Sequence, residues 1–121
     1  MARPSSSAPP AGSLTPGAPS RGSRTGRPIM VLLDALGRRW SLRILWELRG
    51  GARRSFRDLR AACDDISPSV LNDRLKLLRG LALVELGPEG YALTAQGADL
   101  GAKLNDLDAW AKDWAKTLPG D

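Results

Sequence analysis

The sequence predicts a mainly α-helical fold with one small β-hairpin. Residues 55–81 contain two short amphipathic segments joined by a tight turn. Two short strand candidates follow, separated by the turn-forming residues 87–90, and a long helix is expected at about 95–118. Helix, turn, helix and hairpin in this order are typical of a winged helix-turn-helix, here with terminal helices through which we expect two copies to dimerise.

The first 27 residues are expected to form a disordered leader. They are rich in Pro, Ser, Gly and Arg, and Leu14 is their only large apolar residue after Met1. Such a segment buries too little surface to offset the entropy of ordering it. We therefore divide the chain into a leader, 1–27, and a winged helix-turn-helix domain, 28–121. The leader is either a basic arm for DNA or an inert extension, and its composition favours the second.

Two helices are expected before the central unit. Pro28 opens the first, because proline suits the first helical position. Ser41 is expected to cap the second, which ends at Gly50. Apolar residues spread widely around this second helix, so we expect it to be central. Around Trp40 and Trp46 the sequence favours a filled core over a ligand cavity.

The central unit carries recognisable helix-start signals. Ser55 is followed three residues later by Asp58, which is the spacing of a capping box. Residues 64–66 then interrupt the helical pattern. Ser67 and Pro68 restart it, with serine at the N-cap and proline at the first helical position.

The second helix of this unit has an apolar side and a polar side. At about 100° per residue, its leucines gather on one side. The opposite side carries short hydrogen-bonding groups and one cation: Ser69, Asn72, Asp73 and Lys76. Such a set can contact base edges in the DNA major groove. An ordinary solvated helix face explains these residues equally well. The choice between this alternative and a DNA-contacting face therefore depends on the surrounding sequence.

Positive charge is concentrated on the central unit. The formal net charge is +5, yet residues 38–79 hold eleven bases and five acids, and residues 80–121 hold three bases and seven acids. This asymmetry suits a polyanionic partner, namely double-stranded DNA. The candidates for phosphate contacts are Arg38, Arg39, Arg53, Arg54, Arg57 and Ser67. For Arg53 and Arg54, merely solubilising a turn is an equally open alternative.

Composition argues against several other classes of function. The chain has no histidine and a single cysteine, Cys63, which disfavours histidine-based catalysis, a Cys/His zinc site and a disulfide framework. No apolar run approaches the roughly 20 residues of a membrane span, and the N-terminus lacks the apolar core of a secretory signal. We expect a cytoplasmic protein that is not an enzyme and uses no metal or cofactor.

The C-terminal helix offers a surface for a partner. Its apolar positions alternate steps of four and three, and two tryptophans lie one turn apart near the end. An internal core could explain this stripe, but the domain is small and the helix is long. We expect a homodimer interface made of Leu32, Leu104, Leu107, Trp110, Ala111, Trp114 and Leu118.

Four motifs follow one another along the folded part. They are LDALGRRWS at 33–41, SFRDLR at 55–60, ISPSVLNDRLK at 66–76 and YALTAQG at 91–97. In this order, and with Pro28-Ile29 before them, they resemble the HxlR-type branch of the winged helix-turn-helix transcriptional regulators. The resemblance covers about residues 28–115. It implies a small dimeric DNA-binding regulator of a kind that often responds to a metabolite or an electrophile.

Departures from the family pattern narrow what the resemblance implies. Several redox-responsive members place a cysteine just before the opening proline, where this chain has Arg27. Cys63 precedes two aspartates, and because carboxylates and burial raise a thiol pKa, we expect it to be structural. Members often carry a basic residue where Ser69 stands, so base reading should differ. The short wing carries Glu85 and Glu89, so strong phosphate binding is not expected there.

Arg74 falls inside the apolar arc of its helix. It either reaches a DNA phosphate or forms a structural ion pair with an acid of a neighbouring helix, and the geometry favours the ion pair because a buried unpaired charge is costly.

The sequence therefore predicts a sequence-specific DNA-binding transcriptional regulator, a dimeric repressor that places helix 67–80 in the major groove. The alternative is a winged-helix module that binds another protein and has no specific DNA binding. A small-molecule effector is left open, and no membrane association is expected.

Overall fold

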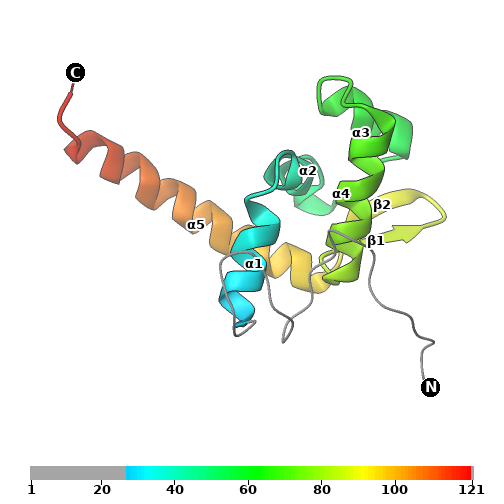
Figure 1. Cartoon of the computed structure of the whole chain (residues 1–121), viewed down its shortest axis with the longest axis horizontal. Helices are drawn as coiled ribbons and strands as arrows, with labels where there is room; N and C mark the ends of the chain where they lie inside the picture. Colours follow the sequence, from blue (N-terminus) through cyan, green and yellow to red (C-terminus); the bar gives the residue numbers. More distant parts are fainter. Residues whose placement is uncertain (1–26, 121) are drawn as a thin grey trace.

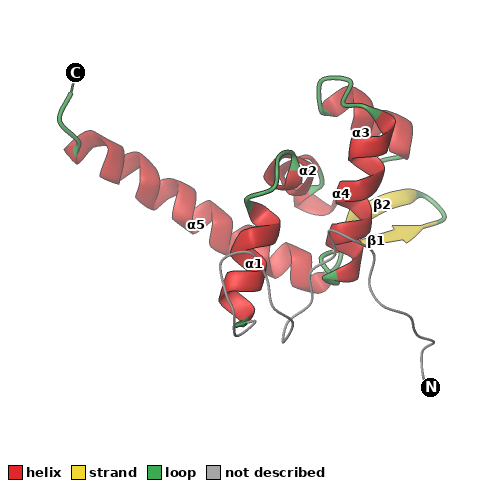
Figure 2. Cartoon of the chain, in the orientation of Figure 1, coloured by secondary structure: helices red, strands yellow, loops and turns green. Residues whose placement is uncertain are grey.

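The computed structural model describes residues 27–120. Figure 1 shows the order of its elements: α1 (Pro28–Leu36), α2 (Ser41–Glu47), the 3-10 turn η1 (Arg49–Gly51), α3 (Phe56–Ala62), α4 (Pro68–Gly80), β1 (Val84–Gly87), β2 (Gly90–Leu93) and α5 (Ala95–Thr117). Helices make up most of the described part, and its one sheet is the two-stranded hairpin (Figure 2). The predicted mainly α-helical winged fold is confirmed. Apart from Arg27, the leader predicted at 1–27 lies outside the described residues.

Three helices begin where the sequence predicts them. The side chains of Ser55, Ser67 and Thr94 each accept a hydrogen bond from the backbone N–H three residues later, at 3.0, 3.2 and 2.9 Å. Each bond satisfies one of the amides that the first turn of a helix leaves unpaired. These local signals place the start of α3, α4 and α5.

The start of α2 differs from the prediction. Ser41 is the first helical residue rather than the cap, and its hydroxyl makes no capping hydrogen bond. The residue before it, Trp40, has a left-handed backbone with φ of 79°. The chain turns between α1 and α2 within residues 37–40, and Ser41, next to this turn, is completely buried.

The main core lies where α2, α3 and α4 meet the base of the hairpin. Ile44, Leu48, Leu59, Leu71 and Leu78 are all fully buried there. Burying such a side chain contributes roughly 1.5–3 kcal/mol to stability. Since α4 supplies two of these residues, its apolar side is firmly held against the domain.

The helix α1 packs on α4 through a second, smaller cluster. This cluster consists of Val31, Ala35 and Leu77. On another side of α1, Ile29 and Leu33 are 56% and 52% exposed. One side of α1 is therefore committed to α4, and a second apolar side remains uncovered.

The hairpin is tied to the segment that precedes α3. The strands β1 and β2 pair in antiparallel register, ending with Gly87 opposite Gly90. Arg54 and Tyr91 exchange two backbone hydrogen bonds of 3.0 and 2.8 Å. A side chain at Gly90 would place its Cβ 2.5 Å from the Arg54 carbonyl oxygen, so glycine is required there.

Only the first half of α5 packs against the rest of the domain. Leu100 and Leu104 contact the core, whereas Leu107, Trp110 and Trp114 are 57%, 60% and 48% exposed. Figure 1 shows the second half projecting away from the other helices. Within residues 27–120, no helix is both long enough and apolar enough to cross a membrane.

Candidate nucleic-acid interface

The helix α4 has one side in the core and one side open to solvent. Leu71, Leu75 and Leu78 on its inner side are at most 1% exposed. The outer side holds the four residues predicted to face bases, all of them exposed: Ser69, Asn72, Asp73 and Lys76. Burial of the leucines fixes the rotation of α4 about its axis. The polar edge, as we call these four residues, is therefore held outward.

Most side chains of the polar edge form no hydrogen bond or ion pair within the described part of the domain. The side chains of Asn72, Asp73 and Lys76 make no hydrogen bond or ion pair with residues 27–120. Ser69 has one weak contact, a 3.5 Å separation between its Oγ and that of Ser67. These amide, carboxylate and ammonium groups can therefore donate to or accept from another molecule without breaking an internal bond.

A strained turn separates α3 from α4. Asp64 and Asp65 both have left-handed backbones, with φ of 58° and 57°. Aspartate tolerates this conformation better than most residues do. The turn is held by Arg60, whose Nε donates to the Ile66 carbonyl at 2.8 Å and whose carbonyl accepts from the Asp65 N–H at 2.8 Å.

Two of the predicted phosphate ligands are used inside the fold. The Nε of Arg54 donates to the Glu47 carbonyl at 2.9 Å, and its Nη2 lies 3.7 Å from the Glu47 carboxylate. Arg38 is 23% exposed and lies 3.8 Å from the carboxylate of Asp34. Arg54 closes the C-terminal end of α2, and Arg38 lies beside Asp34 at the turn after α1, so phosphate binding by these two arginines stays a prediction.

The other basic candidates are more accessible. Arg39 is exposed, with its guanidinium carbon 5.4 Å from the ring centre of Trp40. Arg57, on α3, is exposed and forms no ion pair within residues 27–120. Arg53 is exposed but pairs with Glu85 of the wing at 3.1 Å. The hydroxyl of Ser67 accepts the capping bond of α4 and keeps its own proton for donation.

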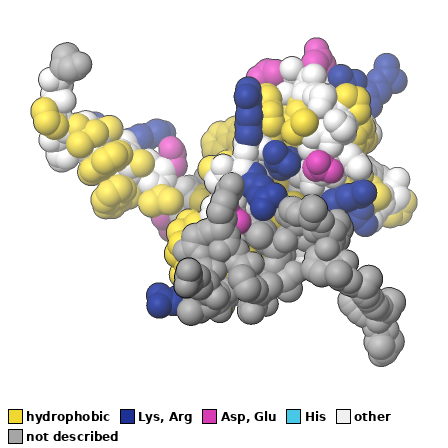
Figure 3. Space-filling model, viewed as in Figure 1, with side chains coloured by type: hydrophobic (Ala, Val, Ile, Leu, Met, Phe, Trp, Pro, Cys, Tyr) yellow, Lys and Arg dark blue, Asp and Glu magenta, His cyan; other side chains and the backbone are white. Residues whose placement is uncertain are grey.

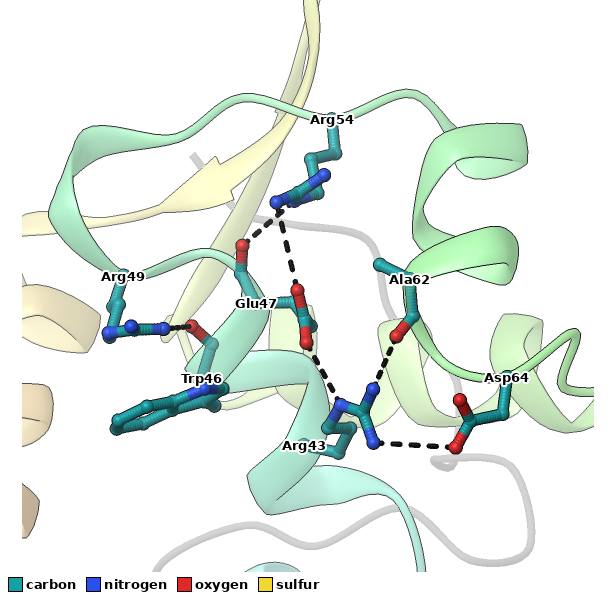
Figure 4. A network of polar contacts seen from close by, with 7 residues as sticks. All are labelled: Arg43, Trp46, Glu47, Arg49, Arg54, Ala62 and Asp64. Carbon is teal, nitrogen blue, oxygen red and sulfur yellow. Dashed lines mark hydrogen bonds and ion pairs between the residues drawn. The ribbon is translucent and has the colours of Figure 1, made fainter.

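A polar network that sequence reasoning missed joins α2 to the end of α3 (Figure 4). At its centre, Arg43 donates to the Glu47 carboxylate at 2.9 Å and to the Ala62 carbonyl at 2.6 Å. It also lies 3.5 Å from the carboxylate of Asp64. The hydrogen bond with Glu47 raises the pKa of Arg43 above its usual value. The i, i+4 spacing of Arg43 and Glu47 was the one local signal available.

Arg74 is structural, but its predicted acidic partner was wrong. Its Nε donates to the backbone carbonyl of Arg39 at 2.7 Å. Within residues 27–120 it forms no ion pair. The accepting carbonyl lies in the turn between α1 and α2, where regular helix hydrogen bonding is interrupted and an acceptor is available to a distant side chain.

The predicted dimer residues fall into two groups. Leu32 and Leu104 are partly buried against the core, whereas Leu107, Trp110, Trp114 and Leu118 are exposed and Ala111 is half-buried. The two tryptophan rings stack with centres 5.8 Å apart. Figure 3 shows hydrophobic side chains gathered on the projecting part of α5. From α1 the sequence analysis named Leu32 for the interface, whereas the large apolar residues that α1 exposes are Ile29 and Leu33.

The only cysteine is sequestered. Cys63 is fully buried in the main core, and this burial is the largest cause of a thiol pKa above its ordinary value. In the described part of the chain, no group of three or more His, Cys, Asp or Glu side chains is placed to hold a metal ion.

The region of Trp46 is more open than predicted. Trp40 packs against the core, but Trp46 is 48% exposed and lines a groove of about 650 Å³ between α2 and α5. The expectation of a filled core is corrected at this point. The residues that α5 presents to the groove include Gly97, Ala98 and Gly101, which are too small to fill it.

Comparison with known proteins agrees with this geometry. Residues 35–118 match the family model described as HxlR-like helix-turn-helix. The chain is 34% identical over 89 residues to the uncharacterized HTH-type transcriptional regulator YvaP of Bacillus subtilis (strain 168), covering 68% of this chain and 82% of that protein. It is 34% identical over 93 residues to the HTH-type transcriptional regulator YodB of the same organism, covering 71% and 80%. The crystal structure of quinone-bound YodB superposes with a TM-score of 0.65 at 30% identity, covering 71% of this chain and 96% of that one.

Proposed function

This chain belongs to the HxlR-like helix-turn-helix family and is a DNA-binding transcriptional regulator, and from that premise we propose that it is a dimeric repressor of operator DNA. In this proposal α4 enters the major groove. One observation carries it: the inner leucines of α4 are buried while its polar edge is exposed. The helix can therefore approach DNA without rearranging the core.

The polar edge has the chemistry for reading bases. An asparagine such as Asn72 can pair with adenine, the carboxylate of Asp73 can accept from cytosine, and Lys76 can donate to guanine. The hydroxyl of Ser69 suits either a donor or an acceptor. Each well-formed pair discriminates against a wrong base by roughly 1–3 kcal/mol.

Arginines beside α4 are proposed to bind phosphates. Arg39 and Arg57 are exposed without an ion pair in the described part of the chain, and Arg53 can exchange Glu85 for a phosphate. Such contacts set affinity rather than sequence preference. Each phosphate that is neutralised should add roughly 0.9 to the slope of log affinity against log salt.

Dimerisation is proposed through the uncovered apolar sides of α5 and α1. Leu107, Trp110 and Trp114 on α5 and Ile29 and Leu33 on α1 are each about half exposed or more. Isolated exposed leucines are common on monomers, but a contiguous stripe with two tryptophans is typical of an interface. Two α4 helices about one duplex turn apart, roughly 34–36 Å, would then face successive major grooves.

We propose that DNA binding by this protein is not regulated through modification of a cysteine thiol. A solved structure of the relative YodB is quinone-bound. In this chain Arg27 precedes Pro28, and Cys63 is fully buried. We further infer that the protein acts in the cytoplasm, by occupying a promoter rather than by catalysis.

Selection of bound sites from random DNA tests this proposal. The full chain should enrich a palindromic site with half-sites about one duplex turn apart. A doubly substituted protein, Asn72→Ala with Lys76→Ala, should lose the preference but keep weak, salt-sensitive binding to unrelated DNA. Absence of enrichment, together with no mobility shift up to micromolar protein, would contradict the proposal and favour a protein-interaction module.

A further inference from the structure

The groove between α2 and α5 is large enough to hold a small molecule. Its volume of about 650 Å³ lies within the roughly 300–1,000 Å³ of small-molecule sites. Leu42, Leu45 and Trp46 of α2 line one wall, and Leu104 and Leu107 of α5 line the other. The walls are therefore apolar and include one aromatic ring.

Small residues on α5 keep the groove open. Gly97, Ala98, Gly101 and Ala102 face it, and a Cβ added at Gly101 would meet no atom within 4 Å. Gly97 has a structural reason to be glycine, because a Cβ there would collide with the carbonyl of Leu83. Gly101 has no such neighbour, so the space above it is free volume.

The charge at the rim of the groove is uneven. Arg49 lies 3.5 Å from the ring centre of Trp46 and donates to the Trp46 carbonyl at 3.0 Å. Figure 4 shows this arginine over the indole. The other charged lining residues are paired, Arg43 with two acids and Asp108 with Lys112 at 3.1 Å. Arg49 has no carboxylate partner within residues 27–120, so the uncompensated charge of the rim is positive.

From this geometry we propose that the groove binds a planar aromatic anion. The ring system packs between Trp46 and the leucines of α5. The carboxylate or sulfonate of the ligand accepts hydrogen bonds from Arg49. One N–H of Arg49 donates to the Trp46 carbonyl of α2, and its other four N–H groups remain available. The two oxygens of a carboxylate match two parallel N–H groups of the arginine guanidinium in geometry as well as in charge.

A second copy of the chain is a poorer fit for the groove. At 100° per residue, Trp110 and Trp114 lie on nearly the opposite side of α5 from Gly101 and Asn105, which line the groove. A partner helix seated on the tryptophans would leave the part of the groove around Gly101 and Asn105 uncovered. The tryptophans and the Gly101 part of the groove therefore lie on different sides of α5, and the two surfaces meet at Leu107 and Ala111, which line the groove and also belong to the proposed dimer surface.

Occupancy of the groove would also affect DNA binding. The ligand would contact α2, which packs on the helix-turn-helix, and α5, which carries the proposed dimer surface. A change in their separation would alter the spacing of the two α4 helices. This regulatory consequence rests on the proposed function, whereas binding in the groove does not.

The test uses the full chain without DNA and three probes of matched shape. They are 2-naphthoate, the neutral 2-naphthamide and the cationic 2-naphthylmethylammonium, titrated by calorimetry and followed by NMR of the tryptophan indole N–H signals. We expect saturable binding of naphthoate at least tenfold tighter than of the ammonium compound. The Trp46 indole signal should shift, and those of Trp110 and Trp114 should not.

Three variants sharpen the result. Arg49→Gln should bind naphthoate and naphthamide equally, because only the charge-dependent part is lost. Gly101→Leu should fill the groove and abolish binding of all three probes, while helix propensity favours leucine over glycine and preserves folding. Ala109→Leu, on the same helix but outside the groove lining, should bind as the wild type does.

Several outcomes would overturn the inference. These are no saturable binding, shifts confined to Trp110 and Trp114, or undiminished binding by Gly101→Leu. A dimer that becomes monomeric in Gly101→Leu would instead make the groove an interface between copies. Operator binding without probe binding refutes this inference alone, and probe binding without operator binding refutes the proposed function alone.

Discussion

The Nε of Arg74 donates a 2.7 Å hydrogen bond to the carbonyl oxygen of Arg39. This bond joins α4, which carries the polar edge, to the turn between α1 and α2. On the next helix turn, Leu77 packs against Val31 and Ala35 of α1. The orientation of α4 is therefore supported by an apolar contact with α1 and by a polar contact with the turn that follows α1.

Replacing Arg74 should affect both folding and DNA binding. Arg74→Ala is expected to lower the free energy of unfolding by about 1 kcal/mol, the typical net worth of one hydrogen bond, and to weaken operator binding because α4 is less firmly oriented. Urea unfolding and mobility shifts measure the two effects. Arg79→Ala, an exposed arginine of the same helix, is the control. Unchanged stability with lost binding would place Arg74 on the DNA instead.

Replacing residues of the polar edge should leave stability alone. Asn72→Ala and Lys76→Ala remove exposed side chains without internal bonds, so thermal unfolding should stay within about 0.5 kcal/mol of wild type. Operator affinity should fall by roughly 1–3 kcal/mol for each. Affinity for unrelated DNA is the control for Asn72→Ala and should not change. Equal losses on both DNAs would argue against base reading by Asn72.

Two neighbouring arginines should behave differently. Arg54→Ala breaks the bonds with Glu47, and because it leaves the Glu47 carbonyl without its hydrogen bond while Arg43 still pairs the carboxylate, it should cost about 1–3 kcal/mol of stability. Arg53→Ala loses only an exposed ion pair with Glu85, worth about 0–1 kcal/mol, and should lower DNA affinity and its salt slope. Chemical unfolding and salt titrations compare the pair. Similar stability losses in both variants would refute the distinction.

Charging the end of α5 should disrupt the proposed dimer. Trp110→Glu or Trp114→Glu places a carboxylate in an apolar interface, where burying it unpaired is costly. Analytical ultracentrifugation should show a monomer that remains folded, because both tryptophans are about half exposed or more. Lys112→Glu, which changes charge at an exposed position of the same helix, should remain dimeric. Dimers in both tryptophan variants would exclude this surface.

The thiol of Cys63 should be unreactive in the folded protein. Burial raises its pKa and keeps it protonated, so a thiol-specific reagent should react only as the protein unfolds. A raised folded-state pKa stabilises the fold below the unfolded-state pKa, and this contribution is lost as pH rises through the folded value. Wild type should therefore lose more stability in alkali than Cys63→Ala does. Rapid labelling without denaturant would contradict this prediction.

Several features of the fold could be predicted because their signals are local. Ser55, Ser67 and Thr94 start their helices through bonds that span three residues. The exposure of the polar edge follows from helical periodicity, since the buried leucines leave it only one direction to face. Ser41 was misjudged because the tight turn before α2, rather than a cap, determines where that helix begins.

The partners of charged side chains could not be predicted in this way. Arg74 bonds a carbonyl that is 35 residues away in sequence, and Arg53 pairs with an acid 32 residues away. Sequence order carries no signal for which of many acceptors lies within reach. The bonds of Arg43 to Ala62 and Asp64 were missed for the same reason, since they span 19 and 21 residues.

By itself, the sequence determined the order of the helices, the position of the hairpin and the two-sided character of α4. These depend on capping, turn chemistry and the periodic placement of apolar residues, all of which act between near neighbours. Only the tertiary structure decided which arginines form bonds within the domain. It alone also revealed the groove beside Trp46. Both depend on how distant elements pack, because a bond or a void forms only where separate segments meet.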